Sequence, residues 1–160
     1  MRTAFTTLAV VVLASLAGFS VLTASAAPPS AVQIRLHPQA FFPVQFGTWD
    51  ASGSISDSGT YVRTDVHPTG SLPDCPCILE HKATFQEEFV LTGSQGTLTL
   101  KDETLLTPMA EPSIFGDTHA VWQIESGTGD YDAASGHGTG FFGPPLTFYL
   151  DGFVAKIGDG

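Results

Sequence analysis

ATFQEEFVLTG, residues 83 to 93, has the clearest periodicity of any stretch in the chain. Alternate positions carry Phe85, Glu87, Phe89 and Leu91 on one face, and Thr84, Gln86, Glu88 and Val90 on the other. A period of two residues predicts a β-strand, since successive side chains of an extended chain point to opposite sides. Glu87 is the one charge on the apolar face, so this face is predicted to line a core or a cavity with a polar lid.

Similar short runs recur along the chain, separated by turns rich in Gly, Pro and Asp. These runs are VQIRL, WDASGSIS, TYVRTDV, TLTLKDETLL, HAVWQIE, HGTGFF and LTFYLDGFVAKI. With the first run they predict an all-β protein of about eight strands in simple succession. This order favours a closed, calycin-like eight-stranded antiparallel barrel, which has no exposed sheet edge. A two-sheet β-sandwich is the alternative.

Three local signals predict how the strands are joined and interrupted. GSQG at Gly93 to Gly96 predicts a tight turn between two strands. DSG at Asp57 to Gly59 predicts an earlier turn, between WDASGSIS and TYVRTDV. Gly152 lies inside the last run and predicts a β-bulge.

The first 26 residues have the pattern of a secretory signal peptide. Arg2 supplies the positive charge, an apolar run follows, and Ala24-Ser25-Ala26 is an A-x-A cleavage site. A membrane anchor is the alternative for this segment. Cleavage after Ala26 would leave a single barrel domain, residues 27–160, in a secreted or extracytoplasmic protein.

The charge of that domain limits its partners. From residue 27 onward there are five Lys and Arg residues against sixteen Asp and Glu residues, a net charge of −11. Such a domain would repel the phosphates of nucleic acids and anionic lipids. We therefore expect no nucleic-acid partner and no membrane insertion after signal cleavage.

The glycine-rich stretch SGTGDYDAASGHGTGFF, residues 126 to 142, invites a ligand-binding interpretation that its spacing does not support. A dinucleotide fingerprint needs a third glycine where Asp132 stands, and a helix after it. An EF-hand loop needs an oxygen ligand where Ala134 stands. We therefore expect Gly127, Gly129 and Gly136 to be structural, providing positive φ and close backbone approach in a turn.

The same stretch carries a resemblance to a known group of barrels. GTGDYDAASGHG resembles the G-T-G-x-[F/Y]-x-x-A-x-G hairpin of allene oxide cyclase-like and dirigent proteins, and of small secreted bacterial barrel proteins of unknown function. The matching positions are Gly127, Thr128, Gly129, Tyr131, Ala134 and Gly136. The resemblance implies a barrel fold. In the plant relatives catalysis rests on barrel-lining acids outside this hairpin, and none of those acids is assigned here.

The segment HPTGSLPDCPCILEH, residues 67 to 81, holds two thiols and two imidazoles. Cys75 and Cys77 are expected to form a disulfide if the protein is exported. Free thiols are the second possibility. A zinc site formed by His67, Cys75, Cys77 and His81 is the weakest, because the cysteines are too close together for the usual spacing.

The acidic residues offer few catalytic candidates. Glu87-Glu88 and Asp102-Glu103 cannot act as dyads, because neighbours on a strand point to opposite faces. We expect these acids, and Asp130 with Asp132, to be solvated surface charges, with Glu87 as the exception. The nucleophile elbow, the zinc-protease motif and the P-loop are all absent from the sequence.

Two functions follow as hypotheses. The first is a non-enzymatic binding or interaction module that holds a small apolar ligand inside the barrel and needs no cofactor, with self-association as an open alternative. The second, allowed by the resemblance, is an isomerase or cyclase acting on a small apolar substrate. The candidate ligand-binding residues are Phe85, Glu87, Phe89 and Tyr131.

Overall fold

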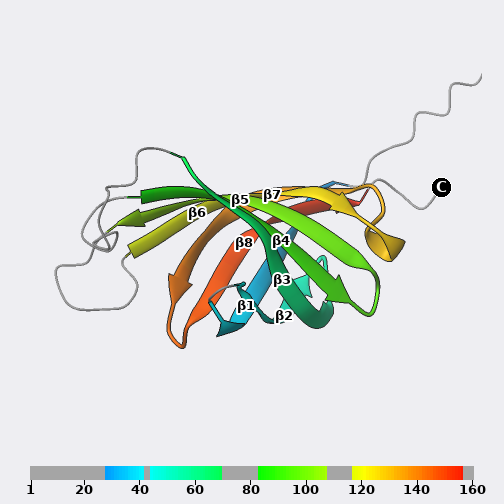
Figure 1. The fold of residues 1–160 in the computed structure, drawn as a ribbon. Helices are drawn as coiled ribbons and strands as arrows, with labels where there is room; N and C mark the ends of the chain where they lie inside the picture. Colours follow the sequence, from blue (N-terminus) through cyan, green and yellow to red (C-terminus); the bar gives the residue numbers. More distant parts are fainter. Residues whose placement is uncertain (1–27, 42–43, 70–82, 108–116, 157–160) are drawn as a thin grey trace, which may run out of the picture.

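The fold is seen in a computed structural model that describes residues 28–41, 44–69, 83–107 and 117–156 (Figure 1). Eight strands follow one another: β1 Ser30–Ala40, β2 Phe46–Gly53, β3 Asp57–Pro68, β4 Ala83–Gly93, β5 Thr97–Thr107, β6 Asp117–Gly127, β7 Ala134–Gly143 and β8 Thr147–Lys156. Among these residues, no helix is long and apolar enough to cross a membrane.

Every strand pairs with its neighbours in sequence, antiparallel throughout. β1 also pairs with β8, from Ser30 opposite Val154 to Leu36 opposite Phe148, and this pairing closes the sheet. The prediction of an eight-stranded antiparallel barrel is confirmed, and the alternative of a β-sandwich is excluded. We name the two ends by their connections. The β2–β3, β4–β5 and β6–β7 connections lie at the turn end, and the opposite end, where β1, β3, β5 and β7 finish, is the loop end.

The interior is filled by the apolar members of the alternating runs. On β4, Phe89 and Leu91 are almost fully buried, and so is the charged Glu87 of the same face. Leu98 and Leu100 of β5 and Ile34 of β1 are also completely buried. Because each strand contributes every second residue to this core, the alternation predicted for the strands is what places these side chains inside.

The turn end is closed by a hydrogen-bond network around one carboxylate. Asp57 accepts hydrogen bonds from the hydroxyl of Tyr131 at 2.7 Å, from the hydroxyl of Ser94 at 2.8 Å and from the backbone N–H of Gln95 at 3.2 Å. Desolvation would raise the pKa of Asp57, but these hydrogen bonds together hold it well below its usual value. The network joins three connections that are far apart in the chain, so it seals this end of the barrel.

The predicted turn at Asp57 to Gly59 is wrong in position. β2 ends at Gly53, which has a φ of 98°, and β3 already begins at Asp57. The turn therefore lies three residues earlier, where glycine tolerates the left-handed backbone. The predicted GSQG turn is confirmed, with the Gly93 N–H donating to the Gly96 carbonyl at 2.9 Å.

Gly152 is not a bulge. The pairing of β8 with β7 and with β1 runs through it without a register shift. A Cβ at Gly152 would lie 2.6 Å from the Trp122 ring, and one at the facing Gly138 would lie 2.7 Å from the indole nitrogen. These two glycines make room for the large side chain of Trp122, which donates a hydrogen bond to the Thr139 carbonyl at 3.2 Å.

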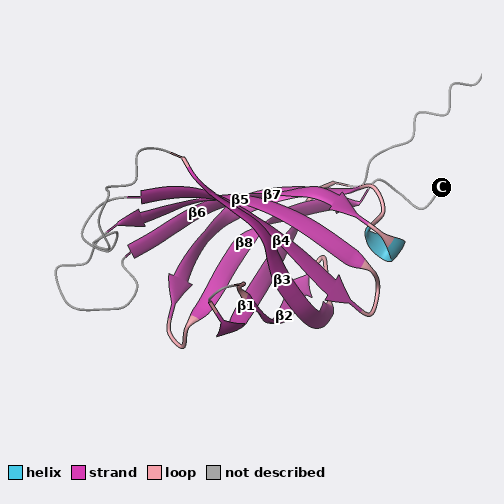
Figure 2. Cartoon of the chain, viewed as in Figure 1, coloured by secondary structure: helices cyan, strands magenta, loops and turns pink. Residues whose placement is uncertain are grey.

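β6 and β7 separate toward the loop end. Their pairing covers four residues on each strand, Ala120–Gln123 against 137–140, although each strand is at least ten residues long. Figure 2 shows the two strands diverging beyond this short seam. The divergence leaves a recess on the outer side of the barrel wall.

Candidate functional site

Polar side chains gather inside the barrel between β3, β4 and β5. Arg63 of β3 donates from Nη1 to Oε1 of Glu87 on β4 at 2.6 Å. The side chains of this ion pair are 16% and 7% exposed. Arg63 shares the inward face of β3 with Tyr61, two residues earlier, and the register shift between Arg63 and Asp65 lies just beyond it. The barrel therefore encloses a charge pair in a largely apolar interior.

Asp102 lies beside this pair. It stands directly opposite Glu87 in the β4–β5 register and is 5% exposed. Its Oδ2 accepts a hydrogen bond from the Thr104 hydroxyl at 3.1 Å, whereas Oδ1 is buried without a hydrogen-bond partner among the described residues. Burial, reinforced by the charge of Glu87, raises the pKa of Asp102 to about 8, with Thr104 and Arg63 opposing the rise. Asp102 therefore keeps its proton at neutral pH.

The expectation that Asp102 is a solvated surface charge is wrong. The reason is its phase on β5, where Leu98, Leu100, Asp102 and Thr104 occupy the same inward face and all are buried. Glu103, the residue between two of them, is exposed, as expected.

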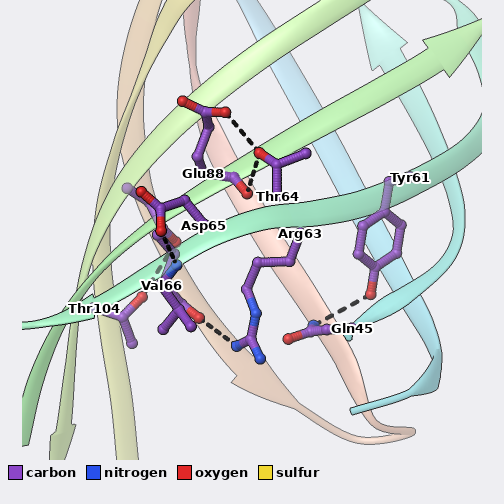
Figure 3. Close-up of polar contacts among 10 residues, drawn as sticks. Gln45, Tyr61, Arg63, Thr64, Asp65, Val66, Glu88 and Thr104 are labelled. Carbon is purple, nitrogen blue, oxygen red and sulfur yellow. Dashed lines mark hydrogen bonds and ion pairs between the residues drawn. The ribbon is translucent and has the colours of Figure 1, made fainter. Parts of the chain in front are cut away.

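A second polar contact lies nearer β2. The Gln45 amide donates to the Tyr61 hydroxyl at 3.2 Å, and Figure 3 shows this pair beside the Arg63 side chain. Burial is the main reason that the pKa of Tyr61 rises to about 12, so its phenol stays protonated. Arg63, Asp102 and Tyr61 can thus all donate hydrogen bonds at neutral pH.

Aromatic rings form a wall next to these polar groups. Tyr61 contacts Phe89 edge-on with centroids 6.0 Å apart, and Phe89 lies 6.3 Å from Phe148. Phe148 in turn contacts Phe142 at 4.7 Å, and Phe142 contacts Phe41 at 6.1 Å. The rings run from the interior to Phe41, the residue after the end of β1. The interior therefore has an aromatic side and, next to it, the polar side formed by Arg63, Glu87 and Asp102.

The structure brings together three of the four residues predicted to bind a ligand. Glu87 and Phe89 face the interior, and Phe85 is half-buried on the same face, opposite Thr104. Tyr131 is elsewhere. It is fully buried at the turn end, with its hydroxyl on Asp57.

Arg63 and Asp102 are the members of the cluster that sequence reasoning missed. Arg63 lies in TYVRTDV two residues after the buried Tyr61, so the alternation of that run places it inside, and the bulge disturbs the phase of the strand only after Arg63. Asp102 was accessible to the same reasoning that found Glu87. Extending the Leu98–Leu100 alternation by two residues places it inside.

The three glycines predicted to be structural differ in what they provide. Gly129 has a φ of 64° and opens the short 3-10 turn Gly129–Tyr131. Gly127 and Gly136 have no positive φ. An added Cβ would instead lie 2.2 Å from the Tyr131 carbonyl oxygen at Gly127, and 2.7 Å from that of Phe153 at Gly136.

The cysteine and histidine cluster is seen only in part. Cys75, Cys77 and His81 lie outside the described residues, so their redox state stays a prediction. His67 is described, and its Nε2 pairs with Asp65 at 2.8 Å on the exposed part of β3. Within the described ranges, no three His, Asp or Glu side chains are grouped so that they would hold a metal ion.

Thr147, His37 and Asp50 at the loop end have the residue types and the contacts of a hydrolase triad, but they lack an accessible nucleophile. His37 contacts Asp50 through Nε2 at 2.7 Å and Thr147 through Nδ1 at 3.2 Å. Thr147 is 1% exposed, and its hydroxyl also donates to the Pro145 carbonyl at 3.3 Å. A substrate carbonyl cannot reach so buried a hydroxyl, and we assign the arrangement to linking β1, β2 and β8.

Comparison with known proteins adds no relative: no family model, curated protein or solved structure matches this chain.

Proposed function

We propose that this protein is a non-enzymatic binding module that holds a small molecule inside the barrel, between the polar cluster and the aromatic wall. The observation that carries the proposal is the buried group of Arg63, Glu87 and Asp102 facing Tyr61 and Phe89. The ligand is mainly apolar and carries one oxygen that accepts hydrogen bonds.

Stability alone does not account for such a cluster. A buried ion pair seldom stabilises a fold more than apolar residues of the same volume, because both charges lose their hydration. The unpartnered Oδ1 of Asp102 adds a further cost of about 1–3 kcal/mol. Buried groups with strongly shifted pKa values concentrate at functional sites, which supports a role in binding for Asp102.

The chemistry of the ligand follows from the donors. The guanidinium of Arg63 has N–H groups beyond the one that bonds Glu87, and protonated Asp102 has an O–H. Both donors suit a carbonyl, carboxylate or sulfonate oxygen. The rings of Phe89 and Phe148 suit an apolar, preferably aromatic, body.

Two fluorescent probes test this proposal. 1-Anilinonaphthalene-8-sulfonate and N-phenyl-1-naphthylamine share an aromatic body, but only the first has acceptor oxygens. We expect saturable one-to-one binding, with the sulfonate bound about tenfold more tightly. The double variant Arg63→Gln/Glu87→Gln has the same net charge and should bind both probes equally. Equal affinities in the wild-type protein, or the same preference in the variant, would contradict the proposal.

An isomerase or cyclase is the second candidate, favoured by the pKa of Asp102. A carboxyl that keeps its proton at neutral pH is what general acid catalysis requires. The resemblance of the 127–138 hairpin to allene oxide cyclase-like barrels supports the same candidate. Its signature would be a bound compound recovered with unchanged mass and a new retention time, and the loss of this conversion in Asp102→Asn.

We also propose that the protein acts outside the cytoplasm, after cleavage behind Ala26. The support is the order of positive, apolar and small residues at the start of the chain. Exported protein should have the intact mass of a chain beginning at Ala27. An exported chain that still carries its first 26 residues would show that the segment is an anchor.

A further inference from the structure

The outer face of the barrel has a hollow of about 660 Å³ where β6 and β7 diverge. Ala120 and Gly140, which face inward, border it at the seam of β6 and β7. The other lining residues are outward-facing residues of β4 to β8. They are Thr84, Glu103, Leu105, His119, Val121, Thr139, Phe141 and Asp151. None of the described residues lining it is Lys or Arg. The hollow is separate from the interior cluster, because alternation sends these side chains to the opposite side of the sheet.

The floor of the hollow is apolar and exposed. Val121 is 58% exposed, Phe141 is 47% exposed and Leu105 is 37% exposed. The Phe141 ring stacks on Tyr149 with centroids 5.0 Å apart and 14° between the planes, which fixes its orientation. Large apolar side chains exposed together in a recess mark a surface suited to binding.

A carboxylate stands at each side of this floor. Glu103, Val121, Thr139 and Asp151 are opposite one another in the register, in one row across β5, β6, β7 and β8. Three strand spacings separate the two acids, roughly 14 Å along the sheet. Neither acid forms an ion pair with a described residue. Arg35, one row away from Asp151, does not pair with it.

We propose that this hollow binds a linear aliphatic diamine, whose two ammonium groups pair with Glu103 and Asp151 while its methylene chain lies over Val121. Charge complementarity selects a cation, since both ends of the hollow are acidic and the chain has a formal net charge of −10. The distance between Glu103 and Asp151 favours a ligand with one cationic group at each end. Nine bonds in an extended chain span roughly 11 Å, and a hydrogen bond of about 3 Å at each end extends the reach to roughly 17 Å, which is enough to bridge the roughly 14 Å between the two strands, whereas five bonds reach only about 12 Å.

Calorimetric titration with four amines at low salt tests which ligand length and which number of charges the hollow prefers. 1,8-Diaminooctane has nine bonds between its nitrogens. 1,4-Diaminobutane is too short to reach both acids, octylamine has one charge, and spermidine has the length of diaminooctane with a third charge over the apolar floor. We expect diaminooctane to bind one-to-one and at least about tenfold more tightly than diaminobutane, because diaminobutane covers less of the floor. We expect it to bind about threefold to fivefold more tightly than octylamine, and more tightly than spermidine.

Variants separate a built site from general attraction to an acidic protein. Glu103→Gln and Asp151→Asn should each reduce diaminooctane affinity about threefold to fivefold and remove its advantage over octylamine. Asp130→Asn, an exposed acid on the β6–β7 turn with the same charge change, should leave the affinity within about twofold. All three substitutions are on exposed side chains, so folding should be preserved.

Several results would overturn the proposal. Equal losses in Glu103→Gln and Asp130→Asn would show nonspecific attraction, and so would affinities independent of chain length. A concentration-dependent dimer that Val121→Ser disperses would show that a second copy of the chain covers this face instead. Sedimentation of the wild-type protein, with and without diaminooctane, decides between a diamine and a dimer.

Discussion

The strongest prediction concerns Asp102→Asn and its effect on how stability depends on pH. Asparagine keeps the size of the side chain and can still accept the Thr104 hydrogen bond, but it does not titrate. In the wild-type protein the folded state holds the Asp102 proton up to a pH of about 8, whereas the unfolded chain releases it near its ordinary pKa of 3.8. Between these values the folded state binds one more proton than the unfolded state.

The sign and size of the effect follow from this difference. A raised carboxyl pKa gives stability that is fully present below pH 4 and is lost as the pH rises toward 8. The loss is about 1.4 kcal/mol per pH unit, or about 6 kcal/mol across the interval. The variant does not lose this stability, but one of its amide N–H groups lies where Oδ1 had no hydrogen-bond partner, at a cost of about 1–3 kcal/mol. We therefore expect the variant to be less stable than wild type at pH 4 and more stable at pH 8, with the two stability curves crossing at about pH 4.5 to 6.

Urea unfolding between pH 4 and 8.5 measures the effect, followed by the fluorescence of the buried Trp49 and Trp122. Carboxylates away from the cluster contribute equally to both curves, so the difference between the curves reports Asp102 together with its coupling to Glu87. Glu103→Gln is the control, because Glu103 is next to Asp102 in the chain but is exposed. The difference in stability between wild type and Glu103→Gln should therefore not change with pH. A constant difference between wild type and Asp102→Asn would refute the argument, since it would mean that Asp102 ionises as it does in water.

Three further predictions test the turn end and the cysteine pair. Tyr131→Phe should lower the free energy of unfolding by about 1–2 kcal/mol at neutral pH, because Asp57 loses a hydrogen bond. Because the unfolded chain titrates identically in both proteins, the deficit should shrink only as the pH falls toward the depressed folded-state pKa of Asp57, well below the usual carboxyl range, and urea melts at pH 2 and 7 would show it. Gly129→Ala should cost about 2 kcal/mol or more in the same assay, because it combines a φ of 64° with a Cβ 2.4 Å from the Gln95 carbonyl oxygen, and an unchanged midpoint would contradict this. Cys75→Ser/Cys77→Ser should fold and lose at most about 1–2 kcal/mol, since a disulfide across so short a loop removes little entropy from the unfolded chain, and two titratable thiols in unreduced protein would contradict the disulfide.

The barrel was predictable because its signal is local and repeated. Each strand alternates apolar and other residues, as Phe89 and Leu91 do, and strand order follows chain order, so no long-range pairing had to be guessed. The face of β4 was predicted for the same reason. The turn before β3 was misplaced because Asp57 and Gly59 have turn propensity, whereas Asp57 is held in the strand by groups from two other connections.

The errors at Gly152 and Asp102 have different causes. Asp102 was misjudged because the alternation of its own strand was not extended past Leu100. Gly152 was misjudged because its environment comes from another strand, where Trp122 lies over β7 and β8. The pKa of Asp102 is raised first by burial and second by Glu87, which stands opposite on β4. Register between strands is not encoded in any single run, so sequence periodicity alone could not show what Gly152 faces or which charge stands beside Asp102.

The two proposed sites share one strand, and the geometry of that strand keeps them independent. Asp102 faces the interior and Glu103, the next residue, faces the outer hollow. The β5–β6 pairing has a register shift between Thr99 and Leu100, beyond which both residues pair regularly with β6. A slip of one residue at that point would put Glu103 inside and Asp102 outside, and so would exchange the acid of one site for that of the other. Binding at the outer hollow should therefore leave the Asp102 titration unchanged, because the two carboxyls lie on opposite sides of the sheet and buried Leu98 and Leu100 fix which face of β5 is inward.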